Sequence, residues 1–324
     1  MRVIMQNDTS DKCFVYFDVL PPIYLANYIT QTLYTGTDGE NGIYYHDGIG
    51  TYTNADQEAG DNSYRYAGAN PNNYVCFGSD EAICPNDNLY RIIGVFDGQV
   101  KLIKYDYAND NLLGDDGLYS NYVYTNDSST YYRGNKLTIN RYYWADSTTY
   151  NIWSESILNK VNLNTNYLAS FEGKWGDLIT ESSWQVGGIP YRDSYGVSKA
   201  IYNLEVGINS TSGYNTKIGL MYISDYGYAA SPENWQTTLY NYNNDTNRNN
   251  NWMWMGLDEF TISSSSNTAY DTFIISSNGK LDGNESLDNS LWNFIVAVRP
   301  CFYLKSNAEY VGGTGTESDP FRID

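Results

Sequence analysis

Two apolar runs separated by a turn dipeptide give the clearest pattern in the chain. Residues 89–96 and 99–105 are rich in β-branched and aromatic side chains, and Asp97-Gly98 separates them. This arrangement predicts a β-hairpin, because Asp-Gly accepts the left-handed backbone of a two-residue turn. A third apolar run at 297–304 predicts a strand, which we expect to join the hairpin in one sheet. Pro300 predicts a bulge or an edge position there.

Apolar residues at helical spacing predict helices in the middle of the chain and one short helix near its start. The first of the central segments places Trp153, Ile157, Leu158 and Val161 on one face. We expect helices at residues 22–33 (after Pro21-Pro22), 153–161, 164–171 and 174–182. Their apolar faces are expected to pack into a core.

A second β-rich part is expected from residues 217–225 onward. It is interrupted by an asparagine-rich stretch, 241–251, which predicts a long polar loop. Strands, then helices, then strands and loops indicate the α+β class. We expect residues 1–60 to form an N-terminal segment with a short helix and loops, and residues 61–324 to form one binding domain.

The charge balance excludes some classes of partner. The chain has 38 acidic and 19 basic residues, a net charge of -19. Nucleic acids and anionic membrane surfaces attract clustered Lys and Arg, so neither is an expected partner. No stretch of 18 apolar residues occurs, so no membrane span is expected. Residues 1–8 lack the apolar core of a signal peptide, so an export leader is expected to lie outside this sequence.

Tyrosine is unusually frequent, with 34 residues, and asparagine is also abundant. These two residue types provide the rigid amphipathic surface and adaptable hydrogen bonds of binding loops. Tyrosines that cover the faces of β-sheets are the alternative explanation, and it accounts for most of them.

Histidine and cysteine limit the possible chemistry. His46 is the only histidine and lies in a turn-like segment, which excludes a histidine-rich metal centre and speaks against a histidine-assisted nucleophile. Cys76 and Cys84 enclose a short loop that suits a disulfide, typical of an oxidising compartment. The sequence leaves open whether Cys13 and Cys301 pair or are free. We expect no cofactor and no metal, because the acidic clusters match no calcium loop and favour solvated turns.

The best candidate for hydrolytic chemistry is the carboxylate pair Asp258 and Glu259, beside Trp252 and Trp254. Neighbouring residues on a strand point to opposite faces, which works against a shared catalytic site. The glycine-rich residues 312–316 lack the Lys-Ser/Thr ending and the following helix of a phosphate loop. The sequence therefore favours a binding protein over an enzyme.

Several blocks in residues 64–324 also carry a family resemblance. They are residues 73–78 (NYVCFG), 88–95 (NLYRIIGV), 217–227 (KIGLMYISDYG), 251–256 (NWMWMG), 297–300 (AVRP) and 312–316 (GGTGT). Together they resemble surface and pilin-like proteins of gut Firmicutes. The chain departs from that group in lacking a prepilin leader and in having Cys301 after Arg-Pro.

The arrangement is also similar to the C-type-lectin-like fold of formylglycine-generating-enzyme-like domains and of the variable proteins of diversity-generating retroelements. That resemblance implies a central antiparallel sheet, about two helices and long loops. The catalytic cysteine pair of formylglycine-generating enzymes has no match here. In the variable proteins a C-terminal region carries diversified contact residues, and residues 261–293 look like such a region.

The resulting hypothesis is an adhesin-like protein, displayed on a cell, pilus or virion, that binds a protein or a glycan. A carbohydrate-active enzyme and a structural pilin or virion subunit are the alternatives. We expect the ligand face between residues 252 and 292, on loops over a rigid body. The predicted contact residues are Trp254, Asp258, Tyr270, Asp271, Asn278, Asn284 and Trp292.

Overall fold

The computed structural model describes most of the chain and shows a mixed α+β protein with 28% helix and 29% strand. The described residues are 21–48, 57–116, 119–124, 137–145, 150–171, 173–190, 196–206, 213–286 and 296–324. The α+β expectation is confirmed at this level. None of the helices in these ranges is long and apolar enough to cross a bilayer.

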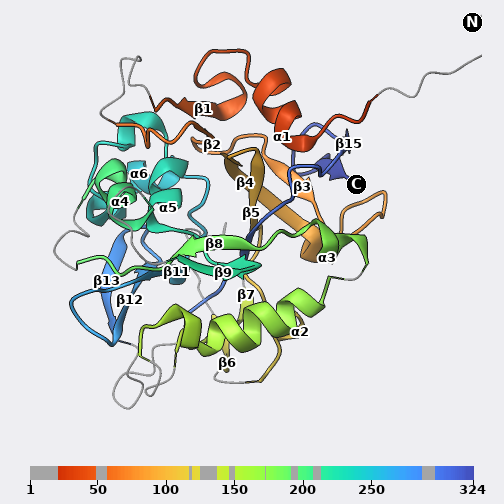
Figure 1. Cartoon of the computed structure of the whole chain (residues 1–324). Coiled ribbons are helices and arrows are strands. Elements are labelled where there is room, and N and C mark those ends of the chain that lie inside the picture. Colours follow the sequence, from red (N-terminus) through yellow and green to blue (C-terminus); the bar gives the residue numbers. More distant parts are fainter. Residues whose placement is uncertain are drawn as a thin grey trace, which may run out of the picture.

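The main sheet has nine strands and occupies the centre of the molecule (Figure 1). Its strands are β1 (Ile43–His46), β2 (Ser63–Tyr66), β3 (Tyr74–Cys76), β4 (Leu89–Phe96), β5 (Gln99–Lys104), β10 (Ile218–Gly219), β14 (Cys301–Tyr303), β15 (Tyr310–Gly312) and β16 (Phe321–Ile323). The order is β10-β14-β5-β4-β3-β16-β15, and β2 joins β1 to β4. The expected central antiparallel sheet is a mixed one, because β16 pairs parallel to β3 while the other pairings are antiparallel.

The predicted hairpin is confirmed. Strands β4 and β5 pair antiparallel, and Asp97 and Gly98 turn between them with φ of 48° and 76°. The expectation that the third apolar run joins the same sheet is also confirmed, because β14 pairs with β5. Pro300 occupies neither a bulge nor an edge. It directly precedes β14, an interior strand, and its carbonyl accepts the Lys104 amide at 3.0 Å.

Helices are more numerous than expected, and most are short. The α-helices are α1 (Leu25–Asn27), α2 (Asp110–Leu113), α3 (Lys174–Leu178), α4 (Ser198–Glu205), α5 (Ile223–Ala229) and α6 (Asp245–Asn249). Tyr28–Leu33 and Leu158–Tyr167 are π-helical, and short 3-10 turns lie at Glu40–Gly42, Asn86–Asn88, Trp153–Glu155, Pro232–Asn234 and Leu239–Asn243. The helix expected at 22–33 is present as α1 and the π-helix that follows it. The two helices expected at 153–161 and 164–171 are replaced largely by the single π-helix Leu158–Tyr167.

Three sequence expectations about local structure are wrong. The helix expected at 174–182 ends at Leu178. Residues 217–225 hold only the two residues of β10 before α5 begins, and the expected loop at 241–251 contains α6. The side chain of Asn244 caps α6 by accepting the Thr246 amide at 2.8 Å, a local signal hidden among many asparagines.

The described residues also form three smaller sheets. They are β6 (Tyr119–Tyr124) with β7 (Leu137–Tyr142), β8 (Ser182–Gln185) with β9 (Gly213–Thr216), and the three-stranded sheet of β11 (Glu259–Ser264), β12 (Asp271–Ile275) and β13 (Leu281–Ser286). Helices α4, α5 and α6 gather at one side of the main sheet, near β11–β13, and β15 lies at the other side (Figure 1).

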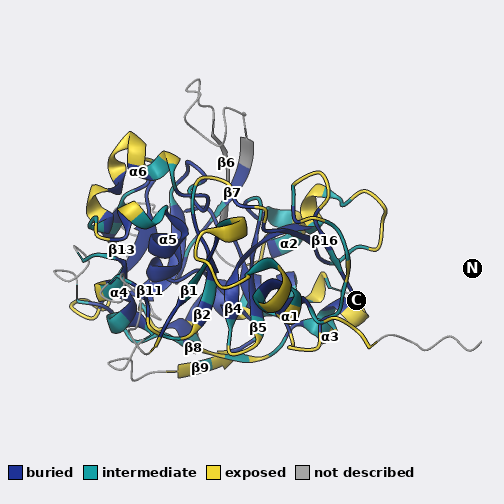
Figure 2. Ribbon diagram, turned by 90° about the horizontal axis from the view of Figure 1, so that it is seen from above, coloured by how far each residue is buried: buried dark blue, intermediate teal, exposed yellow. Residues whose placement is uncertain are grey.

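One large apolar cluster forms the core and includes residues from both ends of the chain. Leu25, Ile29 and Ile43 are fully buried in it together with Phe302 and Phe321. Figure 2 shows the buried residues along the strands of the main sheet and in α5. The described part of the N-terminal segment is therefore built into the sheet and the core.

Two basic residues of the main sheet meet one carboxylate of α5 in the interior. The Lys101 Nζ lies 2.6 Å from Asp225 Oδ2, and Arg65 Nη1 lies 3.6 Å from Asp225 Oδ1. All three side chains are at most 3% exposed. Arg65 also binds Asp61 Oδ2 at 2.6 Å. This network holds β2, β5 and α5 together, and removing one partner would leave a buried charge uncompensated.

The Asp61 carboxylate makes this network sensitive to acid. Burial by itself would raise the pKa of Asp61, yet the Arg65 guanidinium and the Ser63 hydroxyl lower it from 3.8 to about 2. A carboxyl with a depressed folded pKa stabilises the protein above its unfolded pKa, and this contribution is lost as the pH falls towards about 2. We expect the gap in unfolding free energy between the wild type and Asp61→Asn to shrink by about 2 kcal/mol from pH 6 to pH 2.

Urea unfolding of both proteins across this pH range measures the gap. Asp97→Asn at the exposed hairpin turn is the matched control for the removal of one carboxylate. A gap for Asp61→Asn that changes no more with pH than the gap for Asp97→Asn would contradict the role assigned to the Arg65 pair.

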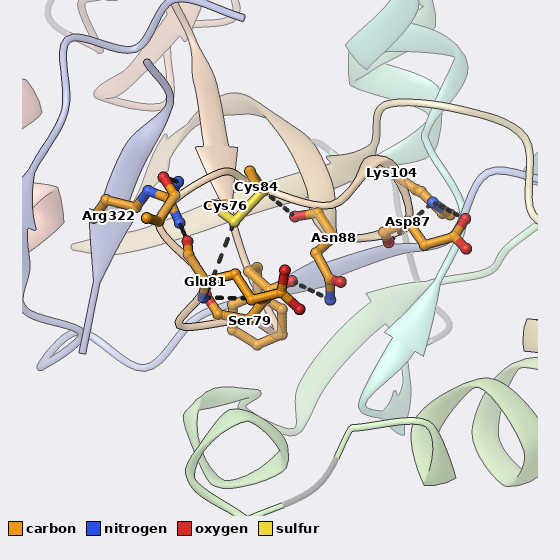
Figure 3. The surroundings of a disulfide bond; sticks show 10 residues. Cys76, Ser79, Glu81, Cys84, Asp87, Asn88, Lys104 and Arg322 are labelled. Atoms are coloured by element: carbon orange, nitrogen blue, oxygen red, sulfur yellow. Dashed lines mark hydrogen bonds and ion pairs between the residues drawn. A yellow bond between two sulfur atoms is a disulfide. The ribbon is translucent and has the colours of Figure 1, made fainter. Parts of the chain in front are cut away.

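The predicted disulfide between Cys76 and Cys84 is present. It ties the end of β3 to the turn before β4 (Figure 3). Arg322 of β16 donates to the carbonyls of Glu81 and Ala82 in the enclosed loop at 2.7 and 2.8 Å, so the loop is also held to the strand beside β3. Cys301 is buried and free, and Cys13 lies outside the described residues.

Replacing both Cys76 and Cys84 by Ser should lower the unfolding free energy by about 2–3 kcal/mol, because a closed loop of this length restricts the unfolded chain. Chemical denaturation measures the loss. Dithiothreitol should destabilise the wild type and leave the double variant unchanged. Free thiols at both positions in protein purified from an oxidising compartment would show that the bond does not form.

Candidate recognition groove

The loop between β11 and β12 forms one wall of a surface groove of about 630 Å³. Residues 151–154, Val186–Gly188 and Gly213–Tyr214 complete it, so four segments distant in the sequence meet here. The residues lining the groove are Asn151, Ile152, Trp153, Ser154, Val186, Gly187, Gly188, Gly213, Tyr214, Ser264, Ser265, Ser266, Asn267, Thr268 and Ala269. Its volume falls in the range typical of small-molecule and ligand sites.

Hydrogen bonds from outside the loop hold its backbone in place. The Asn151 Nδ2 lies 2.8, 2.9 and 3.0 Å from the carbonyl oxygens of Ser265, Thr268 and Asp271. From the other side, Ile189 donates to the Ser264 carbonyl and accepts from the Ser266 amide, at 2.8 and 2.9 Å. The loop is therefore ordered before a ligand arrives, which lowers the entropic cost of binding.

Two exposed tyrosines lie beside the groove. Tyr270 is 43% exposed and ends the loop, and Tyr150 is 41% exposed and precedes Asn151. Their ring centroids are 5.3 Å apart in an edge-to-face arrangement. Tyr150 has a φ of 52°, a left-handed backbone that is rare for an aromatic residue and often found at functional sites.

The predicted contact residues separate into two groups at opposite ends of β12. Tyr270 and Asp271 lie at its start, next to the groove, and Asp271 accepts the Thr268 hydroxyl at 2.7 Å. Trp254, Asp258 and Asn278 gather at the turn after β12. There the Trp254 Nε1 donates to the Ser277 carbonyl at 3.2 Å and Asp258 Oδ1 accepts the Ser277 amide at 2.7 Å.

The last two predicted contact residues, Asn284 and Trp292, lie in neither group. Asn284 lies in β13, and Trp292 lies outside the described residues. The described part of residues 261–293 is a three-stranded sheet with loops at residues 265–270 and 276–280, so the expected loops make up only part of this stretch. The many serines and threonines of this stretch face the interior in β11, where Thr261 Oγ1 donates to the Phe273 carbonyl at 2.8 Å.

The carboxylate pair proposed for hydrolysis does not share a site. Glu259 is 2% exposed and forms an ion pair with Arg299 Nε at 2.7 Å, whereas Asp258 is half-buried and bound to the turn after β12. Trp252 is buried, and its Nε1 donates to the Tyr66 carbonyl at 2.8 Å. This arrangement matches the opposite orientation expected of neighbouring strand residues.

His46 ends strand β1 rather than lying in a turn, and it is fully buried. Burial lowers its pKa well below the usual value, and its Nδ1 accepts the Ala59 amide at 2.9 Å. Within the ranges that the structure describes, no three His, Cys, Asp or Glu side chains gather in a way that could hold a metal ion.

Comparison with known proteins identifies no similar family, protein or structure. No family model matches the chain, and neither a curated protein nor a solved structure matches it. The groove and the residues around it are therefore the basis for the proposed function.

Replacing Asn151 by Ala should loosen the groove without unfolding the protein. The variant loses the side-chain contacts to three loop carbonyls, which costs about 1–2 kcal/mol of stability. We expect faster amide hydrogen exchange at residues 265–271, measured by mass spectrometry. Asn278→Ala, in the turn at the other end of β12, should leave exchange in that loop unchanged, and equal protection in the Asn151 variant would show that Asn151 does not order it.

Proposed function

We propose that this chain is an adhesin-like, ligand-binding protein that is displayed outside the cell and recognises its ligand at the groove beside Tyr270. The observation that carries the proposal is the exposed pair of Tyr150 and Tyr270 beside a loop held by Asn151 and Ile189. Exposed aromatic side chains on a fixed loop are typical of binding surfaces, because they contribute large contact area at low entropic cost.

Three further features support display outside the cell on a C-type-lectin-like scaffold. The disulfide between Cys76 and Cys84 belongs to the bonds that persist in oxidising compartments. The sequence blocks resemble surface and pilin-like proteins of gut Firmicutes. Tyr24 pairs with Glu309 in an isolated antiparallel bridge, so the first described residues lie beside the C-terminal strands, as they would in a C-type-lectin-like domain whose two ends meet.

The proposal places the recognition surface at one end of the region similar to diversified segments. Residues 266–270 are exposed positions between two buried strands, so substitutions there change the surface without disturbing the core. The buried strands β11 and β12 would remain constant. In this proposal the residues Trp254, Asp258 and Asn278 support the scaffold at the opposite turn.

Arrays of immobilised glycans and of secreted proteins test the proposed function directly. Ligands found on either array should bind Tyr270→Ala more weakly by about 2 kcal/mol or more, since exposed aromatic residues dominate binding energy at such surfaces. The melting temperature should stay nearly unchanged, because Tyr270 is 43% exposed and its ring contacts another exposed tyrosine, Tyr150, rather than the core.

Tyr240→Ala is the matched control. Tyr240 is 44% exposed and lies near Lys280, beside the turn at the other end of β12. Its replacement should leave binding intact. Ligands that bind Tyr270→Ala and the wild type equally well would place the recognition surface elsewhere and refute the proposal.

A further inference from the structure

The groove differs in charge from the rest of this chain. None of the described residues that line it carries a charged side chain, although the protein has 38 acidic and 19 basic residues. Its polar lining consists of hydroxyl and amide side chains, from Ser154, Ser264, Ser265, Ser266, Thr268, Asn151 and Asn267. A charged ligand would find no complementary charge among these side chains, whereas a neutral ligand with many hydroxyl groups would meet hydroxyl and amide groups. Of these, the Asn151 Nδ2 and the Thr268 hydroxyl already donate hydrogen bonds within the protein, so the serine hydroxyls are the main groups for a ligand.

Glycines let two segments of the groove wall pack closely against their neighbours. Gly188 and Gly213 line the groove, and a Cβ on Gly188 would come within 2.8 Å of the Ser266 amide nitrogen, and one on Gly213 within 2.5 Å of the Ser183 Oγ. The protein itself fills the space beside these glycines, so they shape the groove through close packing and add no charged side chain to it.

A buried donor in the wall of the groove also lacks a partner within the described part of the chain. Trp153 lines the groove and is 2% exposed, and its indole Nε1 makes no hydrogen bond to any described residue. Unpaired buried donors are rare in folded proteins because they cost free energy. Because the Nε1 atom is itself buried, an internal water beside the groove wall would satisfy this donor.

The rim supplies the apolar part of the site. Tyr150 and Tyr270 are the chain neighbours of the lining residues Asn151 and Ala269, and their rings contact each other. Ile152, which lines the groove, is 50% exposed. Sugar rings have an apolar face of C–H groups and an edge of hydroxyls, so an aromatic rim beside a hydroxyl-lined groove matches both parts of one sugar. A groove of about 630 Å³ can hold a few sugar residues.

We propose that the groove binds an uncharged oligosaccharide, with one sugar ring against Tyr150 and Tyr270 and its hydroxyls towards the serine, threonine and asparagine side chains. This proposal rests on the proposed function and adds the class of ligand. A protein partner is the competing occupant. The observations favour a sugar because the groove is concave and uncharged. A protein partner that recognises this acidic chain would present basic groups, and the lining of the groove offers them no carboxylate.

Saturation-transfer difference NMR with defined oligosaccharides tests the class of ligand. The neutral probes are maltohexaose, cellohexaose, xylohexaose, mannohexaose and N-acetylchitohexaose, and the acidic probes are hexagalacturonate and sialyllactose. We expect at least one neutral probe to bind and the acidic probes to bind at least tenfold more weakly in 20 mM salt, because the protein carries a net charge of -19.

Variants then locate the bound sugar, with affinities measured by titration calorimetry. Tyr270→Ala and Tyr150→Ala should each raise the dissociation constant at least tenfold, whereas Tyr270→Phe keeps the ring and should change it less than threefold. Tyr240→Ala should have no effect. Circular dichroism and melting curves show that each variant is folded.

The outcomes separate this proposal from the proposed function. If the arrays yield protein ligands or acidic glycans whose binding depends on Tyr270, the recognition surface is correct and the neutral-sugar assignment is overturned. If neutral sugars bind equally well to the wild type and to both alanine variants, the groove is not their site. If no ligand of any class depends on Tyr270, the proposed function itself fails.

Discussion

Two buried carboxylates at the start of α5 hold the parts of this protein together. Asp225 accepts the Tyr222 amide at 2.9 Å and binds Lys101 of the main sheet. Glu205, at the end of α4, accepts the amides of Ile223 and Ser224 at 2.8 Å each. Both carboxylates are at most 3% exposed, and burial raises the pKa of Glu205.

The helix amides compensate part of the free-energy cost of burying these charges, because carboxylates are stabilised at a helix N-terminus. Loss of either carboxylate would leave several buried donors unpaired.

This polar centre also reaches the sheet that supports the groove. The Ser263 hydroxyl of β11 donates to Glu205 Oε1, and Ser264, the next residue, begins the groove wall. Strand β11 therefore connects to the main sheet through Ser263, Glu205, the first turn of α5, Asp225 and Lys101. A network of this kind fixes relative positions more than it adds stability, since the desolvation of the charges offsets much of their attraction. A pre-ordered groove is the structural benefit that the network provides.

The candidate site was only partly accessible to sequence reasoning. Tyr270 and Asp271 were identified because a polar, aromatic stretch follows a hydrophobic run, and they do lie beside the groove. Asn151, Tyr150 and the glycines of the opposite wall have no sequence signal of their own, because they become neighbours only through long-range packing. Trp254 and Asp258 are near Tyr270 along the chain, but the whole length of strand β11 separates them, so they lie at the other end of the small sheet.

Local interactions explain what the sequence by itself determined. The Asp-Gly hairpin, the helix after Pro22, the short disulfide loop and the α+β class all depend on residues close together in the chain. The parallel pairing of β16 with β3, the helix α5 in place of a strand and the assembly of the groove were decided by the tertiary structure. In each of these cases the decisive partner lies far away in the sequence. Helix α5 is capped by Glu205 from another helix, and the groove loop is held by Asn151 from more than a hundred residues earlier, so no local pattern records either contact.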